Sequence, residues 1–229
     1  MDKKAQVTLF IVVGLIILAL VGTFMYIREQ AVIGEVGEVD ISEVPMELRP
    51  VHNFINDIVY ETAVEGLEIM GLQGGWISID DAELSGETFI IHPDATSSEV
   101  LTFNKMKIPY WYFMSSPNNR LSNYEFSRKG RPLIKSFTDN PADRAEDDKS
   151  MEAQLDRYIE ANLKDRLNLG LASLKSMGYN VQGEGDISAT TLIGEEDISV
   201  SVNYLVVVES GDGKGELDRF FVRIPLNIK

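Results

Sequence analysis

The feature that most constrains this chain is an uninterrupted apolar stretch near its start. Residues 7 to 26 read VTLFIVVGLIILALVGTFMY and carry no charge. At about 1.5 Å rise per residue, a helix of this length spans roughly 30 Å, the thickness of the hydrocarbon core of a bilayer. Its thirteen Val, Leu, Ile and Phe residues favour membrane insertion by roughly 4 to 8 kcal/mol. The sequence therefore predicts a transmembrane helix over residues 7–27, with Val7 and Tyr26 at the ends of its uncharged part.

The charges that flank this stretch predict its orientation. Lys3 and Lys4 precede it, whereas Arg28 follows it directly beside Glu29. Because basic residues stay on the cytoplasmic side, residues 1–6 are expected to form a cytoplasmic leader, with the rest of the chain outside the cell. A cleaved secretory signal is the alternative, but the apolar run is longer than such a signal and no small-x-small site closes it. Membrane lipid is thus an expected partner.

The residues in front of the apolar stretch also carry a resemblance. The order Lys-Lys-Ala-Gln at positions 3–6 resembles the class III signal of archaeal type IV pilin-like proteins. This resemblance implies that a prepilin-type peptidase cuts between Ala5 and Gln6. The chain departs from the family at Phe10, where many pilins carry Glu, and at Gly34, which interrupts a continuous stalk helix. An ordinary uncleaved signal anchor with a short basic leader is the alternative.

Composition excludes several classes of function. The formal net charge is −15, which argues against nucleic acid as a partner because a polyanion binder needs a basic face. The chain has no cysteine, so disulfides, thiolate nucleophiles and cysteine-ligated metals are excluded. Its two histidines, His52 and His92, lack the spacing of metal ligands and are expected to be structural or exposed. Carboxylate clusters at residues 80–83, 139–148 and 212–218 leave a calcium site open, although none has the EF-hand pattern; no cofactor is expected.

The remaining chain predicts one α+β domain with two long helices and antiparallel sheet. We expect a linker over residues 28–49 and the domain over residues 50–229, with a subdivision near 140–150 left open. Apolar side chains at three- and four-residue steps predict helices over residues 50–72 and 150–177. Short β-branched or alternating runs predict strands over residues 76–79, 88–91, 100–103, 108–113, 179–182, 186–193, 198–209 and 217–228.

Two groups of residues are candidates for interaction. The segment with Arg120, Arg128, Lys129 and Arg131 is basic in an otherwise acidic chain, which fits either a solvated loop or self-association through the acidic surface of another copy. Tyr110 and Trp111 lie in the most aromatic stretch, which fits either a core strand or a ligand platform.

The leader, the anchor and the motifs Gly-Gly-Trp-Ile, Ile-Pro-Tyr-Trp and Met-Glu-x-Gln-Leu are also similar to uncharacterised anchored proteins of small-genome archaea. That similarity implies no activity, and no catalytic motif occurs in the sequence. The leading hypothesis is therefore a non-enzymatic membrane-anchored cell-surface protein that acts in assembly, adhesion or envelope organisation. An anchored domain that binds a small ligand or an envelope polymer is the second hypothesis, and an anchored hydrolase is the third.

Overall fold

The chain divides into two compact units, Met1–Glu38 and Val39–Lys229. The computed structural model describes residues 14, 17–19, 21, 23, 44–91, 98–104, 106–111, 113–114, 126–127, 131–135, 149–211 and 213–226. Among these residues, no helix is both long and apolar enough to cross a bilayer. Most of the predicted transmembrane helix, including Val7 and Tyr26, lies outside the described residues, as do Ala5 and Gln6 of the leader.

The second unit is an α+β structure built around two long helices. Helix α2 covers Arg49–Leu72 and has a proline in its first turn, where the missing N–H has no helical partner to lose. Helix α5 covers Met151–Ser176, and the Ser150 side chain caps it by accepting a hydrogen bond from the Ala153 N–H at 3.1 Å. Both predicted helices are confirmed to within one residue at each end.

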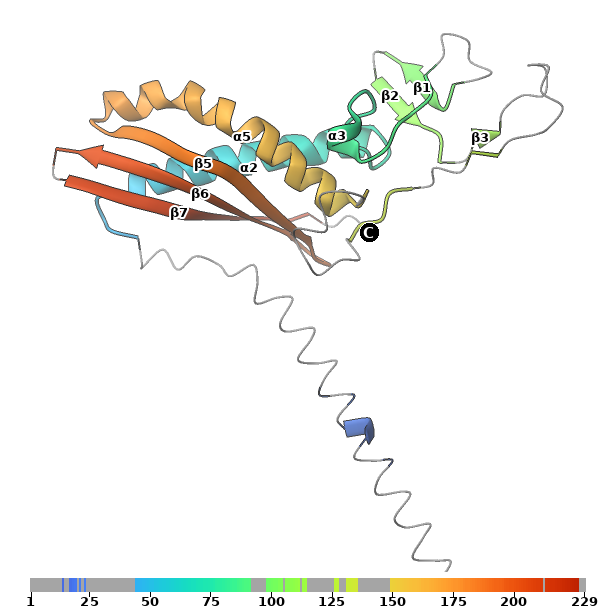
Figure 1. The fold of residues 1–229 in the computed structure, drawn as a ribbon, viewed down its shortest axis with the longest axis horizontal. Coiled ribbons are helices and arrows are strands. Elements are labelled where there is room, and N and C mark those ends of the chain that lie inside the picture. The colour runs from blue at the N-terminus through green and yellow to red at the C-terminus, as the bar shows by residue number, and fades with distance from the viewer. Residues whose placement is uncertain are drawn as a thin grey trace, which may run out of the picture. The chain divides into compact units, whose positions relative to one another are not determined.

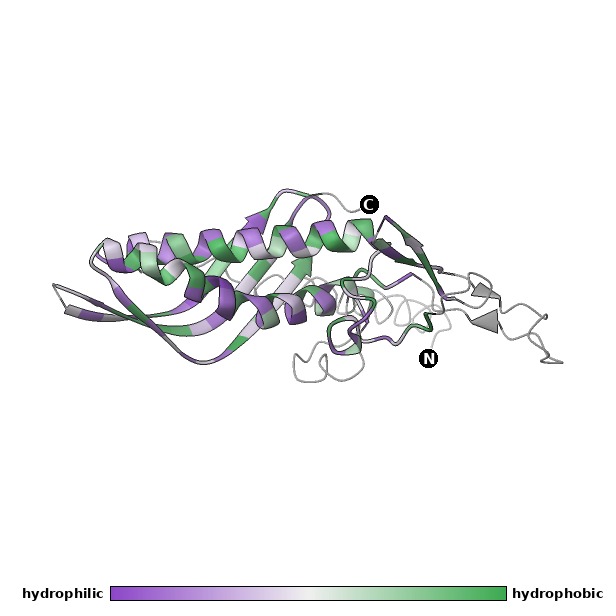
Figure 2. Ribbon diagram, turned by 90° about the horizontal axis from the view of Figure 1, so that it is seen from above, coloured by the Kyte–Doolittle hydropathy of each residue, from purple (hydrophilic) through white to green (hydrophobic). Residues whose placement is uncertain are grey.

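A three-stranded antiparallel sheet lies against these helices. Its strands are β5 (Asn180–Ile193), β6 (Ile198–Ser210) and β7 (Gly213–Ile224), in the order β5-β6-β7. Both helices cover one face of the sheet, with α5 over β5 and α2 over β7 (Figure 1). Hydrophobic and hydrophilic residues alternate along the helices and strands (Figure 2), and the hydrophobic ones meet between the two layers in one core cluster.

The structure corrects two predictions in this sheet. The strands expected over residues 179–182 and 186–193 are one strand, β5, whose pairing with β6 shifts register between Glu184 and Ser188. Extra residues at such a bulge bend a strand without ending it, and Gly185 supplies the left-handed conformation there with φ of 84°. The last strand ends at Ile224 rather than residue 228, because Pro225 has no N–H for a ladder. Leu226, which follows Pro225 and lies in the predicted strand, is 43% exposed.

Two carboxylates of α5 fasten the outer edge of β5. Glu152 accepts a hydrogen bond from the Ile193 N–H at 2.8 Å, and Glu160 accepts one from the Ala189 N–H at 2.9 Å. Lys164 lies one turn further along α5, but the Glu160 carboxylate bonds to the strand. Burial raises the pKa of Glu160, and its bond to Ala189 opposes that shift only in part.

The segment between the two helices forms a smaller apolar cluster of Trp76, Ile79, Phe89 and Val100. The strand predicted over residues 76–79 is wrong, because the Ile77 N–H bonds to the side chain of Gln154 at 2.9 Å and not to a strand. Residues 88–91 are not a strand either; the Ile90 backbone bonds to Glu99 at both its N–H and its carbonyl.

The regular elements of this segment are short. They are α3 (Ala82–Ser85), the hairpin of β1 (Val100–Phe103) and β2 (Met106–Pro109), and the pair of β3 (Phe113–Met114) and β4 (Phe126–Ser127). The strand predicted over residues 100–103 is confirmed, whereas the one over 108–113 is interrupted after Pro109.

Candidate functional site

Strand β6 loses register with both of its neighbours near Tyr204. Its pairing with β7 shifts register between Asn203 and Val206. Its pairing with β5 shifts between Leu205, which pairs with Glu184, and Asn203, which pairs with Ser188. Bulges of this kind re-aim side chains and recur beside functional sites. Both register shifts of the sheet therefore lie beside Tyr204, which makes its surroundings a candidate site.

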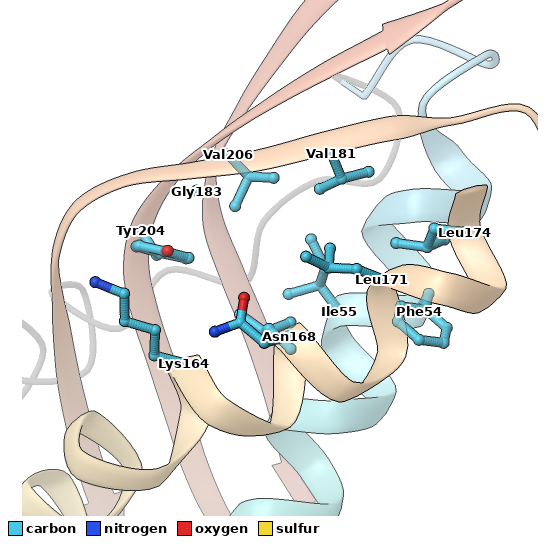
Figure 3. A pocket seen from close by; sticks show the side chains of 11 residues that line it. Phe54, Ile55, Lys164, Asn168, Leu171, Leu174, Val181, Gly183, Tyr204 and Val206 are labelled. Carbon is cyan, nitrogen blue, oxygen red and sulfur yellow. The ribbon is translucent and has the colours of Figure 1, made fainter.

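The Tyr204 side chain lies across Gly183 of β5. A Cβ atom at position 183 would come within 1.9 Å of the tyrosine hydroxyl, so a larger residue there would force the Tyr204 ring to move. Beside the ring is a hollow of about 30 Å³ between α2, α5 and the sheet, lined mainly by apolar side chains (Figure 3). Figure 3 shows Lys164 and Asn168 rising from α5 on the side of the tyrosine.

This first hollow is small, and its tyrosine is not ionised at neutral pH. At about 15 Å³ of accessible space per water molecule, it has room for roughly two waters and not for an organic ligand. Burial raises the pKa of the Tyr204 hydroxyl above its usual value of 10.0, so the group stays protonated at neutral pH. We therefore interpret the hollow as a space in the core that water molecules fill.

A second and larger hollow lies where the start of α2 meets β7. This recess has a volume of about 150 Å³ and is lined by Val44, Pro45, His52, Glu216, Leu217, Asp218 and Arg219. Leu217 and the neighbouring Phe220 belong to the core, whereas the charged residues between them are exposed. One wall of the recess is thus buried, whereas its rim is charged and accessible to solvent.

His52 forms part of the buried wall. Its side chain is 1% exposed, and its ring stacks on Phe220 with centroids 5.5 Å apart and planes at 26°. The ring Nδ1 lies 3.4 Å from the amide nitrogen of Asn56, whereas Nε2 has no hydrogen-bond partner. A buried polar atom without a partner is uncommon in folded proteins.

The charge state of His52 follows from its burial. Desolvation lowers its pKa below 6.5, and the backbone of Arg219 and the side chain of Asn53 offset this only in part. The Arg219 backbone is thus close to the ring, although Nε2 has no partner in hydrogen-bonding geometry. The imidazole is therefore neutral at pH 7.

The start of α2 adds positive potential close to the same wall. Leu48 occupies the N-cap position, so no side chain caps the helix, and the first turn contains no acidic residue. Free N–H groups at a helix start carry partial positive charge. The Arg49 side chain donates from Nε to the Val44 carbonyl at 3.3 Å, which holds the preceding chain beside the helix.

The rim carries charges of both signs. Glu216 and Asp218 are exposed carboxylates, and the Arg219 guanidinium lies 4.0 Å from Asp218 as an exposed pair. Within the described ranges, no group of three or more His, Asp or Glu residues has the arrangement of a metal site. The recess therefore offers hydrogen-bond donors and acceptors rather than a cluster of metal ligands.

The interaction residues suggested by the sequence lie elsewhere. Tyr110 and Trp111 follow β2 and are 38% and 51% exposed. Trp111 donates from Nε1 to the Gly74 carbonyl at 3.1 Å, which fixes the indole. Arg131 is exposed. The other members of the basic segment, Arg120, Arg128 and Lys129, fall outside the described residues.

Sequence reasoning missed the recess, although it expected His52 to be structural or exposed. The histidine is indeed buried, and it shares the apolar face of α2 with Ile55 and Val59. That spacing was the available signal for burial. Nothing local in the sequence indicates that β7, more than 160 residues later, completes a recess around it.

Comparisons of the chain with models of protein families, with curated proteins and with solved structures found no match.

Proposed function

We propose that this protein is a non-enzymatic, membrane-anchored cell-surface protein that holds residues 50–229 outside the cytoplasm. The observation that carries the proposal is the uncharged stretch of residues 7–26 behind Lys3 and Lys4. Such a stretch is long enough to span a bilayer, and the basic pair keeps its start in the cytoplasm.

The packing of the second unit supports this view. Its main core cluster draws buried residues from α2, α5 and all three strands of the large sheet, and its first member in the described chain is Val44. The two units also separate at residues 38 and 39 by their internal contacts. Within the described residues this core belongs to the second unit. The described Ile17, Leu18 and Val21 of the apolar stretch are exposed, and an apolar helix with exposed side chains is stable in lipid.

The leader points to a role in assembly, adhesion or organisation of the cell envelope. Its resemblance to pilin-like signals suggests that a prepilin-type peptidase processes it between Ala5 and Gln6. A processed anchor of that kind would let copies associate in the membrane through their apolar helices while their domains face the exterior.

Fractionation of cells that express the full chain tests the anchor. We expect the protein to remain with membranes after alkaline carbonate extraction, and the domain to be cleaved by protease added to intact cells. The double variant Ile17→Lys/Leu18→Lys adds roughly 5 to 7 kcal/mol to the insertion cost and should move the protein to the soluble fraction. Ile17→Leu/Leu18→Ile is the matched control. Release of the unaltered chain by carbonate would refute the anchor.

Mass spectrometry of the mature protein tests the leader separately. A chain that begins at Gln6 supports processing by a prepilin-type peptidase. An intact N-terminus would remove the pilin-like part of the proposal and leave the anchor in place.

A further inference from the structure

The outer edge of β7 forms no ladder with another strand in the described part of the chain. An edge of this kind can pair with an extended segment of suitable sequence. We propose that residues 39–42 of the same chain pair with residues 221–224 of this edge, as a short fourth strand antiparallel to β7. The proposal concerns the second unit alone and is independent of the membrane anchor.

The course of the chain before α2 favours this occupant over any other. A Cβ atom on Gly215 would lie 2.5 Å from Leu48 Cδ1, and Val44 lines the recess together with Arg219. From Leu48 back to Val44, the chain therefore follows β7 from its start towards its middle. Continued in the same direction at about 3.3 Å per residue, this course brings residues 39–42 alongside the end of β7.

The sequence of this short segment fits the faces of β7. It reads Val-Asp-Ile-Ser, so apolar and polar side chains alternate as they do in a half-buried strand. Over residues 220–224, β7 alternates in the same way between buried core positions and more exposed positions. Directly opposite residues of neighbouring strands share a face. Ile41 therefore pairs with Val222 on the core side, and Asp40 pairs with Arg223 on the other side.

Charge favours the same register. Arg223 is exposed, and its Nε lies 3.0 Å from Asp197 in the turn between β5 and β6. A guanidinium group has five N–H donors, so it can also bond to a second carboxylate. Opposite charges directly across an antiparallel pair stabilise the pairing, and Asp40 supplies that charge. At the outer edge of β5, by contrast, an added strand would have to displace Glu152 and Glu160.

Disulfide trapping tests the proposal, because the chain has no cysteine of its own. Directly opposite residues of antiparallel strands have Cα atoms about 4.5 to 5.5 Å apart, which lies within the range of a disulfide. The full-chain variants Asp40→Cys/Arg223→Cys and Ser42→Cys/Phe221→Cys should each form an intramolecular disulfide when oxidised in detergent. The product should run as a faster monomer on a non-reducing gel, and the second variant keeps both charges.

Asp40→Cys/Lys214→Cys is the control for these variants. Lys214 lies at the other end of β7, roughly 30 Å from Arg223 at about 3.3 Å per residue. This pair should stay reduced, and trapping as efficient as that of the test pairs would refute the register.

Hydrogen exchange on the unaltered full chain supplies a measurement that depends on no cysteine variant. The backbone N–H groups of residues 39–42 that bond to β7 should exchange slowly. Ile41→Asn should raise their exchange rate by about tenfold or more, because it removes the buried apolar side chain of the segment. Asp40→Asn keeps that side chain and should have a smaller effect.

Three results would overturn the proposal. One is the lack of an intramolecular disulfide in both test pairs. Another is a disulfide between copies in place of the intramolecular one, because it would assign the edge to a second molecule. The third is exchange of residues 39–42 in the unaltered chain at the rate of an unfolded peptide.

Discussion

Gly66 lies on α2 where it packs tightly against α5, and it yields the sharpest prediction about the fold. A Cβ atom at this position would lie 2.6 Å from Leu155 Cδ1 and 2.9 Å from Tyr158 Cδ1. Ordinary carbon contacts are about 3.5 to 4.0 Å, so each neighbour would have to retreat by roughly 1 Å. Leu155 is fully buried and Tyr158 is nearly so, which leaves them little room to move.

Two opposing effects set the outcome of Gly66→Ala. Alanine in a helix is better than glycine by about 1 kcal/mol, whereas overpacking a filled core costs about 1 to 3 kcal/mol. The expected net loss is therefore about 1 kcal/mol in the free energy of unfolding. For a domain of this size, that loss corresponds to a fall of about 2 to 4 °C in Tm.

Gly71 provides a matched control in the same helix. A Cβ atom there would meet nothing within 4 Å, so Gly71→Ala should stabilise the protein by roughly 0.5 to 1 kcal/mol. The assay is guanidinium unfolding of the full chain in detergent, followed by far-ultraviolet circular dichroism. The double variant Gly66→Ala/Leu155→Val should recover about 1 kcal/mol of coupling energy, because the shorter side chain makes room for the new methyl group. If Gly66→Ala stabilises the protein as much as Gly71→Ala does, the close approach of the helices is refuted.

Three further variants test the electrostatics and the sheet. Folding raises the pKa of Glu160, so the stabilisation that its carboxyl group contributes is present below pH 4.5 and is lost as pH rises through the folded pKa. Glu160→Gln should therefore stabilise the protein at pH 7 and have no such effect near pH 4. Unfolding measured across this pH range tests the prediction. Folding lowers the pKa of His52, so the stabilisation that the neutral ring contributes is present above pH 6.5 and is lost as pH falls through the folded pKa. His52→Phe should accordingly flatten the loss of Tm between pH 7 and 5, and an unchanged slope would contradict this. Gly183→Ala should lower stability by about 1 to 3 kcal/mol through contact with Tyr204, whereas Gly211→Ala, in open space, should not.

The long helices and the central strand could be predicted because their signals are local. Ser150 caps α5 within its own first turn, and the alternation from Ile198 to Val202 on β6 follows directly from the period of a half-buried strand. The apolar face of α2 repeats at helical spacing in the same way. In each case, the residues that determine the structure lie within a few positions of one another.

The failed predictions depend on partners distant in the sequence. The run at residues 76–79 has the composition of a strand, but its backbone bonds to Gln154, 77 residues further on. The sequence predicts two strands over residues 179–182 and 186–193, whereas pairing with β6 makes them one strand with a bulge between Glu184 and Ser188. The recess likewise requires α2 and β7 to meet, and no local pattern encodes that contact.

The carboxylates that bond to β5 favour β7 as the edge of the large sheet where another strand can add. Glu152 and Glu160 occupy the N–H groups of Ile193 and Ala189 on its outer edge, so an added strand would have to displace both carboxylates there. No backbone hydrogen bond joins the outer edge of β7 to another segment within the part of the chain that the structure describes. An extended segment from another molecule would therefore pair with β7 more readily than with residues 189–193 of β5.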